Sequence, residues 1–125
     1  MDIKNHPSED AEQEALFEWA RMMAGAYPCL EMMFHIPNGG RRDAVTGAAL
    51  KRRGVKAGVP DICLPFPRGK YHGLYIELKV GKNRPTETQK LWLDRLEYCG
   101  YAAVVCYGWR QAVEIIEKYL KGEEL

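Results

Sequence analysis

Two carboxylates and a lysine stand in a pattern that could hold a metal ion. Asp61 opens a short apolar run, and Glu77 and Lys79 follow on a second run after the turn-rich segment LPFPRGKYHG. Residues two apart on a strand share a face, so the turn would bring Asp61 beside Glu77 and Lys79. Paired carboxylates are the hard oxygen ligands that Mg²⁺ or Mn²⁺ prefers. Lys79 would add a cation where a phosphate or an attacking water sits.

A plainer interpretation of the second run stays open at this point. Apolar and polar residues alternate from Leu74 to Val80, as in a strand with one polar face. Tyr75, Glu77 and Lys79 could therefore form the solvated face of an edge strand. In that case Glu77 and Lys79 would be a surface ion pair of little energetic weight.

Helices and strands alternate along the chain in an order that predicts an α/β fold with a mixed central sheet flanked by helices. Ser8 begins the first helix, and Thr86 or Thr88 begins a later one that ends at Gly100. The expected helices cover 8–26, 43–53, 86–99 and 108–119, and the expected strands cover 30–36, 61–64, 74–80 and 101–107. Of these strands, 101–107 is nearly all apolar, which indicates burial on both faces.

Composition places the chain among ordinary globular proteins. It has 125 residues, 46% hydrophobic and 28% charged, so we expect one domain over 1–125 with a core at about 10–120. Charges interrupt every apolar run, which excludes a membrane-spanning helix, and the first 15 residues lack the apolar segment of a secretory signal. The four cysteines have neither disulfide-framework nor zinc-site spacing, which favours a reducing, cytoplasmic location.

The net charge of +1 hides an uneven distribution. Residues 41–85 carry eleven basic and three acidic residues, whereas the segments on both sides are acidic. A positive block of this kind attracts phosphate backbones, although a solvated helix face is an equal alternative. The predicted nucleic-acid contacts are Arg41, Arg42, Lys51, Arg52, Arg53 and Lys56.

These motifs together resemble a known nuclease family. Pro60-Asp61 followed by Glu77-Leu78-Lys79 is similar to the PD-(D/E)xK pattern, and the wider context resembles a stand-alone VRR-NUC (virus-type replication-repair nuclease) domain of phage or bacterial type. The resemblance extends from about Glu12 to about Tyr119. The segments that carry it are Glu12-Gln13, IPNGG at 36–40, KAGVPD at 56–61, YHGLYIELK at 71–79, QKLWL at 89–93 and GYAAVV at 100–105.

The resemblance implies a restriction-endonuclease-like core and a set of site residues. Asp61, Glu77 and the backbone carbonyl of Leu78 would hold the metal, and Lys79 would orient the water or stabilise charge. Glu12 would bind the metal directly or through water, with Glu14 as the alternative helical carboxylate. Gln89 would hydrogen-bond the water or a phosphate. Without the resemblance, Glu12 would be a helix-dipole partner and Gln89 an exposed helix residue.

The expected function is therefore a Mg²⁺- or Mn²⁺-dependent endonuclease acting on DNA, with four-way junctions or flaps as candidate substrates. A nucleic-acid-binding module without activity is the alternative, and a glycosidase-like carboxylate enzyme is a more distant one. Because one small domain has one site and branched DNA must be cut on two strands, we expect a homodimer. Met22, Met32, Met33 and Phe34 are the apolar residues that could form its interface or could belong to the core.

Overall fold

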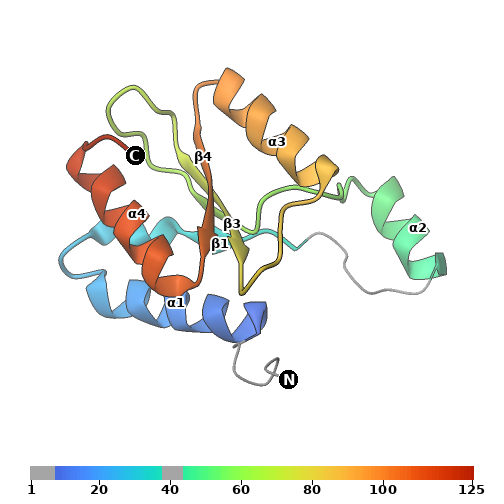
Figure 1. Cartoon of the computed structure of the whole chain (residues 1–125), viewed down its shortest axis with the longest axis horizontal. Helices are drawn as coiled ribbons and strands as arrows, with labels where there is room; N and C mark the ends of the chain where they lie inside the picture. The colour runs from blue at the N-terminus through green and yellow to red at the C-terminus, as the bar shows by residue number, and fades with distance from the viewer. Residues whose placement is uncertain (1–7, 38–43) are drawn as a thin grey trace.

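The computed structural model describes residues 8–37 and 44–125 (Figure 1). Four strands and five helical segments follow one another there, and apart from the short helix η2 their order is the one that the sequence predicts. They are α1 (Glu9–Met23), η2 (Pro28–Met32), β1 (Phe34–His35), α2 (Ala44–Arg52), β2 (Ile62–Leu64), β3 (Leu74–Lys79), α3 (Glu87–Tyr98), β4 (Ala102–Tyr107) and α4 (Trp109–Lys121). The fold is a mixed α/β arrangement, as expected.

The four strands form one mixed sheet in the order β1-β2-β3-β4. β1 and β3 both run antiparallel to β2, and β4 runs parallel to β3. β3 is therefore a central strand, and Glu77 and Lys79 on it are 1% and 8% exposed. The interpretation of these residues as the solvated face of an edge strand is wrong, because β2 and β4 flank β3 on both sides.

Helices cover both faces of the sheet. The side chains of Leu74, Ile76 and Leu78 join one hydrophobic core with residues of α1 and α4, such as Leu16 and Ile116. Because side chains alternate along a strand, Tyr75, Glu77 and Lys79 occupy the opposite face, where α3 packs against β4. Figure 1 shows α1 and α4 on one side of β4 and α3 on the other.

Short polar side chains fix the beginnings of two helices. The Ser8 hydroxyl accepts a hydrogen bond from the Ala11 N–H at 3.0 Å, which confirms the predicted cap of α1. Thr86, rather than Thr88, caps α3: its hydroxyl accepts from the Gln89 N–H, and the Gln89 side chain accepts from the Thr86 N–H. This reciprocal pair is a capping box, and it settles where α3 starts.

Two strand predictions needed correction. The apolar run 30–36 is not one strand: Pro28 starts a 3₁₀ helix that continues to Met32, and the strand that follows is Phe34–His35 alone. Proline favours the first turn of a helix because it has no N–H to leave unpaired.

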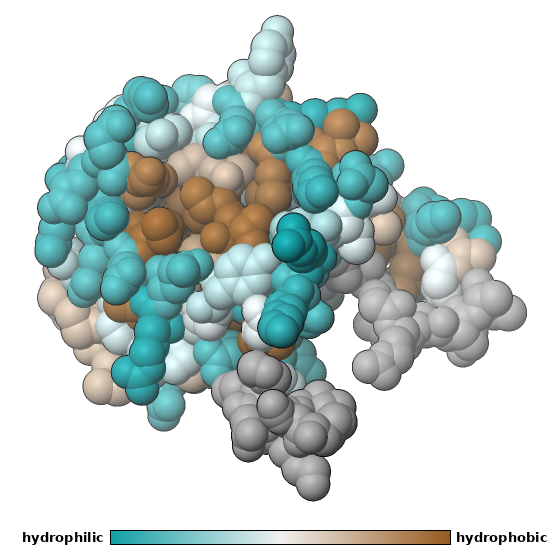
Figure 2. Space-filling model, viewed as in Figure 1, coloured by the Kyte–Doolittle hydropathy of each residue, from teal (hydrophilic) through white to brown (hydrophobic). Residues whose placement is uncertain are grey.

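The other correction concerns 101–107, which was expected to be buried on both faces. β4 is an edge strand, so Val104 and Val105 are half-buried and Tyr107 is exposed. Figure 2 shows the resulting apolar surface over β4, between α4 and α3.

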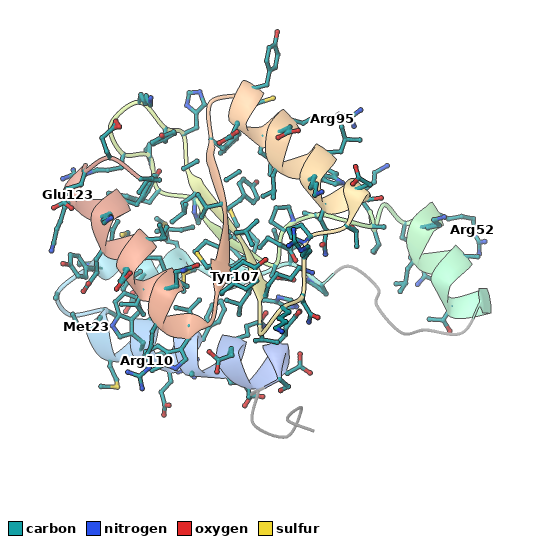
Figure 3. The ribbon with its side chains drawn as sticks, in the orientation of Figure 1. Met23, Arg52, Arg95, Tyr107, Arg110 and Glu123 are labelled. Atoms are coloured by element: carbon teal, nitrogen blue, oxygen red, sulfur yellow. The ribbon has the colours of Figure 1, made fainter. Side chains whose placement is uncertain are left out.

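α2 projects away from the body of the protein (Figure 1). Its C-terminal end is closed by a hydrogen bond from the Val55 N–H to the Leu50 carbonyl, with Gly54 in a positive-φ conformation that favours glycine. Lys51 and Arg52 in its last turn are exposed, and Figure 3 shows Arg52 far from the sheet. None of the helices in the described part of the chain has the length and apolarity of a bilayer-spanning segment.

Candidate active site

The antiparallel register of β2 and β3 brings Asp61 beside Glu77. Ile62 pairs with Ile76, so the residue before Ile62 lies next to the residue after Ile76. One oxygen of Asp61, Oδ2, accepts a hydrogen bond from the Leu78 N–H at 2.8 Å. The Asp61 carboxylate thus accepts from a backbone N–H of β3, as a carbonyl of a neighbouring strand would, and it is held beside the carboxylate of Glu77.

The backbone of Asp61 is equally well held. Its carbonyl oxygen accepts hydrogen bonds from the Ile36 N–H at 2.7 Å and from Nδ1 of His35 at 2.9 Å. Asp61 is therefore tied to β3 through its side chain and to the β1 segment through its main chain. These contacts leave the carboxylate little freedom, which a pre-organised binding site requires.

The burial of the Glu77 carboxylate is energetically unfavourable. Its Oε2 lies 3.5 Å from Nζ of Lys79, while its Oε1 is buried and has no hydrogen-bond partner among the described residues. Burial raises the pKa of Glu77 to about 8, the negative charge of Asp61 acts in the same direction, and Lys79 opposes both. An unpaired buried carboxylate oxygen is destabilising, so this arrangement needs an explanation other than stability.

A divalent cation fits this arrangement. Such an ion would partner the free Oε1 of Glu77 and offset the repulsion between the two carboxylates. Among residues 8–37 and 44–125, no three His, Cys, Asp or Glu side chains come together to hold a metal. The donor set around Asp61 and Glu77 thus consists of two carboxylates, to which backbone carbonyls and water would add.

Glu12 makes its contact at the start of α4 and not at the Asp61–Glu77 pair. Its Oε1 accepts a hydrogen bond from the Trp109 N–H at 2.8 Å, so it caps the start of α4, where Gly108 offers no side chain. A Cβ at position 108 would lie 3.1 Å from that oxygen. Because the Gly108 N–H donates to the Lys79 carbonyl at 3.0 Å, Glu12 stands at the end of β3, beyond Lys79.

Glu14 lies on another side of α1. Its side chain is exposed and lines a shallow hollow with Phe17, Arg21 and His35. His35 alternates with Phe34 along β1, and this hollow lies on the face of the sheet that α1 covers. Of the two helical carboxylates that the sequence offers, Glu12 is therefore the one directed toward the end of β3.

Gln89 contributes one free group to the region. Its Oε1 accepts from the Thr86 N–H at 2.8 Å in the capping box, which leaves the amide nitrogen as the donor available to a phosphate or a water. Its side chain is half-buried rather than exposed.

Contacts between α3 and the segment before Asp61 are a feature that sequence reasoning missed. The indole Nε1 of Trp92 donates to the Ala57 carbonyl at 3.1 Å. Gly58 has φ +89°, and a Cβ there would lie 2.5 Å from Cγ2 of Thr88. Only glycine permits both this conformation and this approach. The GVPD motif at 58–61 is thus pressed against α3, and the glycine that opens it was the available signal.

Exposed cations lie on two segments, α2 with the residues that follow it and the loop after Lys79. Lys51, Arg52, Arg53 and Lys56 are all exposed, as a phosphate-binding role requires. Arg41 and Arg42 lie outside the described residues. The sequence interpretation did not single out Lys82 and Arg84, which are exposed on the loop that directly follows Lys79. The excess of basic residues over 61–85 was their signal.

Comparisons with known proteins agree with the motifs. The family model of the VRR-NUC domain matches residues 5–110. A solved structure described as a VRR_NUC domain protein is similar with a TM-score of 0.78 and 31% sequence identity, over 94% of this chain and 92% of that one. A comparison with curated proteins gave no match.

Because Glu77 is buried, we expect the free energy of unfolding in metal-free buffer to depend on pH in an unusual way. Its pKa is about 8 in the folded protein and near 4.5 in an unfolded chain, so the folded state binds more protons between these values. The free energy of unfolding should therefore fall as pH rises from 5 to 8. Glu77→Gln should remove this decline and be more stable than the natural protein at pH 8 by a few kcal/mol, on the order of the shift itself.

Urea unfolding in EDTA at pH 5, 7 and 8 measures this difference. At pH 5 the two proteins should be nearly equal, since Glu77 is protonated in the folded state. Parallel profiles at all three pH values would contradict the burial of an unpaired carboxylate.

Proposed function

The chain belongs to the VRR-NUC domain family, a nuclease family, and on that premise we propose that it is a metal-dependent endonuclease that hydrolyses DNA phosphodiester bonds. The observation that carries the proposal is the buried Glu77, with one unpartnered oxygen beside Asp61 and Lys79. A fold tolerates such a carboxylate where function requires it.

Asp61, Glu77 and the Leu78 carbonyl would hold Mg²⁺ or Mn²⁺. When bound, the ion lowers the pKa of water and offsets negative charge on the scissile phosphate. The protein itself contributes orientation: the Leu78 N–H fixes one oxygen of Asp61, and its other oxygen is left to bind. Glu77 presents Oε1, which no described residue engages.

Lys79 and Gln89 would act on the phosphate or the water. The Lys79 side chain is 10% exposed and its Nζ lies 3.5 Å from Glu77 Oε2, so its charge stays close to the carboxylates where the phosphate arrives. There it would stabilise charge that develops in the transition state. The amide nitrogen of Gln89 would donate a hydrogen bond from the start of α3.

Glu12 would serve the site from the end of β3. With Oε1 engaged by the Trp109 N–H, its other oxygen is the one that could bind water around the ion. Glu12 would therefore act through water, and its hydrogen bond also links α1 to α4.

A nucleic-acid-binding module without activity is the alternative. Phosphate binding needs cations, and acidic side chains beside a phosphate oppose it. A module that only binds DNA would gain nothing from burying Glu77 next to Asp61. The carboxylate pair therefore favours the enzyme.

Asp61→Asn and Glu77→Gln test the reaction. Each should lower Mg²⁺-dependent cleavage of end-labelled DNA by at least about a hundredfold, and each should lower Mg²⁺ or Mn²⁺ affinity in calorimetry. Asn can still accept from the Leu78 N–H, so the fold should persist, which circular dichroism checks. Full activity in Asp61→Asn would reject the proposal.

Lys79→Ala separates chemistry from binding in the same assay. Its single-turnover rate should fall far more than its DNA affinity. An unchanged rate with weaker binding would assign Lys79 to DNA contact instead.

The exposed cations of α2 and the residues that follow it should bind phosphates without regard to sequence. Replacing Lys51, Arg52 and Arg53 by Gln should weaken binding to all DNAs and flatten the plot of log affinity against log salt, by about one unit for each phosphate that is no longer neutralised. A matched replacement of Lys118 and Lys121, at the far end of α4, should leave the slope unchanged. An unchanged slope in the α2 variant would indicate a solvated helix face.

Branched DNA and a homodimer are the finer parts of the proposal. Two copies would present two sites to a substrate with approximate two-fold symmetry. Met22, Met32 and Phe34 are 76%, 46% and 47% exposed, whereas Met33 is buried in the core, so the first three remain available for an interface. Light scattering at micromolar concentration, with and without a four-way junction, should show the dimer mass. A monomer that only nicks the junction would contradict it.

A further inference from the structure

Phe34 is a large aromatic side chain left in water on the face of the sheet that carries the site. It is 47% exposed and belongs to the two-residue edge strand β1. It pairs with Cys63, which pairs with Tyr75. Directly paired residues share a face, so Phe34 lies in the row next to the one that holds Asp61 and Glu77.

Hydrogen bonds fix Phe34 relative to Asp61. The two residues after it, His35 and Ile36, both donate to the Asp61 carbonyl. Diagonal neighbours on adjacent antiparallel strands lie roughly 7–8 Å apart, which is the spacing expected between Phe34 and Asp61. The ring therefore stands beside the site at a set distance.

The core does not explain this ring. Cys63 is 5% exposed and Tyr75 is half-buried, with its ring 5.3 Å from that of Tyr101. Phe34 is thus the uncovered end of a row whose inner members are covered. It is also absent from the hydrophobic core cluster.

The charges around the site indicate what would cover it. Lys56, Lys82 and Arg84 are exposed on the segments that lead into Asp61 and out of Lys79. A polyanion drawn to them would bring a phosphate to the carboxylate pair and its ion, and in DNA each phosphate carries flat bases on either side. An aromatic ring next to a phosphate site matches this chemistry.

Resting on the proposed nuclease function, we propose that Phe34 is a platform on which a nucleobase next to the scissile phosphate stacks. A base inside a duplex is already stacked on both neighbours, and extruding it costs a few kcal/mol. Moving a base that is already unpaired onto the ring costs less free energy, so the platform favours cleavage where the strands separate. This gives a physical reason for a preference for branched DNA.

The experiment compares two DNAs that share one strand, a splayed-arm junction and a full duplex. For the natural protein in Mg²⁺, kcat/KM on the junction should exceed kcat/KM on the duplex. Phe34→Ala should lower this ratio about five- to one-hundredfold, the effect of one base–aromatic stack. Phe34→Trp should keep the ratio, and Phe34→Leu, which is apolar without a flat ring, should lose it.

Tyr98→Ala is the matched control, since it removes an exposed aromatic side chain from the C-terminal end of α3, to which no role in the site or in an interface is assigned. It should leave the ratio unchanged. A ratio that Phe34→Ala does not alter, or that Phe34→Leu keeps, would overturn the proposal. Equal losses on both DNAs together with a lower mass in light scattering would overturn it too, and would assign Phe34 to contact between two copies.

A binding measurement separates this proposal from the nuclease proposal. With 2-aminopurine in the unpaired arm, binding of the natural protein should change its fluorescence, and Phe34→Leu should not. If the natural protein cleaves neither DNA, the nuclease proposal fails, and the fluorescence alone decides for or against stacking on Phe34.

Discussion

Glu77 and Asp61 repel one another in a place that water scarcely reaches, and the fold holds them there. Neighbouring strands on both sides bury Glu77, and the Leu78 N–H draws Asp61 into the same ladder. Lys79 offsets part of this repulsion but leaves one Glu77 oxygen without a partner among the described residues. The rest of the domain supplies the stability that offsets this repulsion. Its core, on the opposite face, packs against the same strand through Leu74, Ile76 and Leu78.

The two faces of β3 thus have different roles: one stabilises the fold, and the other carries the site. Against α1 and α4, the strand gains stability from buried apolar area. Toward α3, it carries the polar side chains, and α3 contributes by holding the segment before Asp61 through Trp92 and Thr88. The start of α3 is fixed by its capping box, so the helix that positions this segment is itself well anchored. Precision at the carboxylates comes from regular elements on both sides rather than from a flexible loop.

Local patterns in the sequence were enough to predict the order of elements, the alternation along β3 and the meeting of Asp61 with Glu77. Each depends on residues close in the chain or on one short turn. The contact of Glu12 with the Trp109 N–H joins residues 97 positions apart, and no local pattern contains it. The run 30–36 was misread because apolar content alone does not distinguish a strand from a 3₁₀ turn, and Pro28 decided between them. The burial of Glu77 depended on strand order, which alternation does not reveal.

Asp61 also determines when the site exists during synthesis. Its bond to Leu78 spans 17 positions and its bond to His35 spans 26, and the cover over β3 comes from β4 and α4, which follow it in the chain. A chain that has not yet added β4 and α4 has both carboxylates but lacks the elements that cover β3. Closure of the sheet is therefore the step at which the polypeptide acquires its site, and a truncated or misfolded copy carries the residues without it.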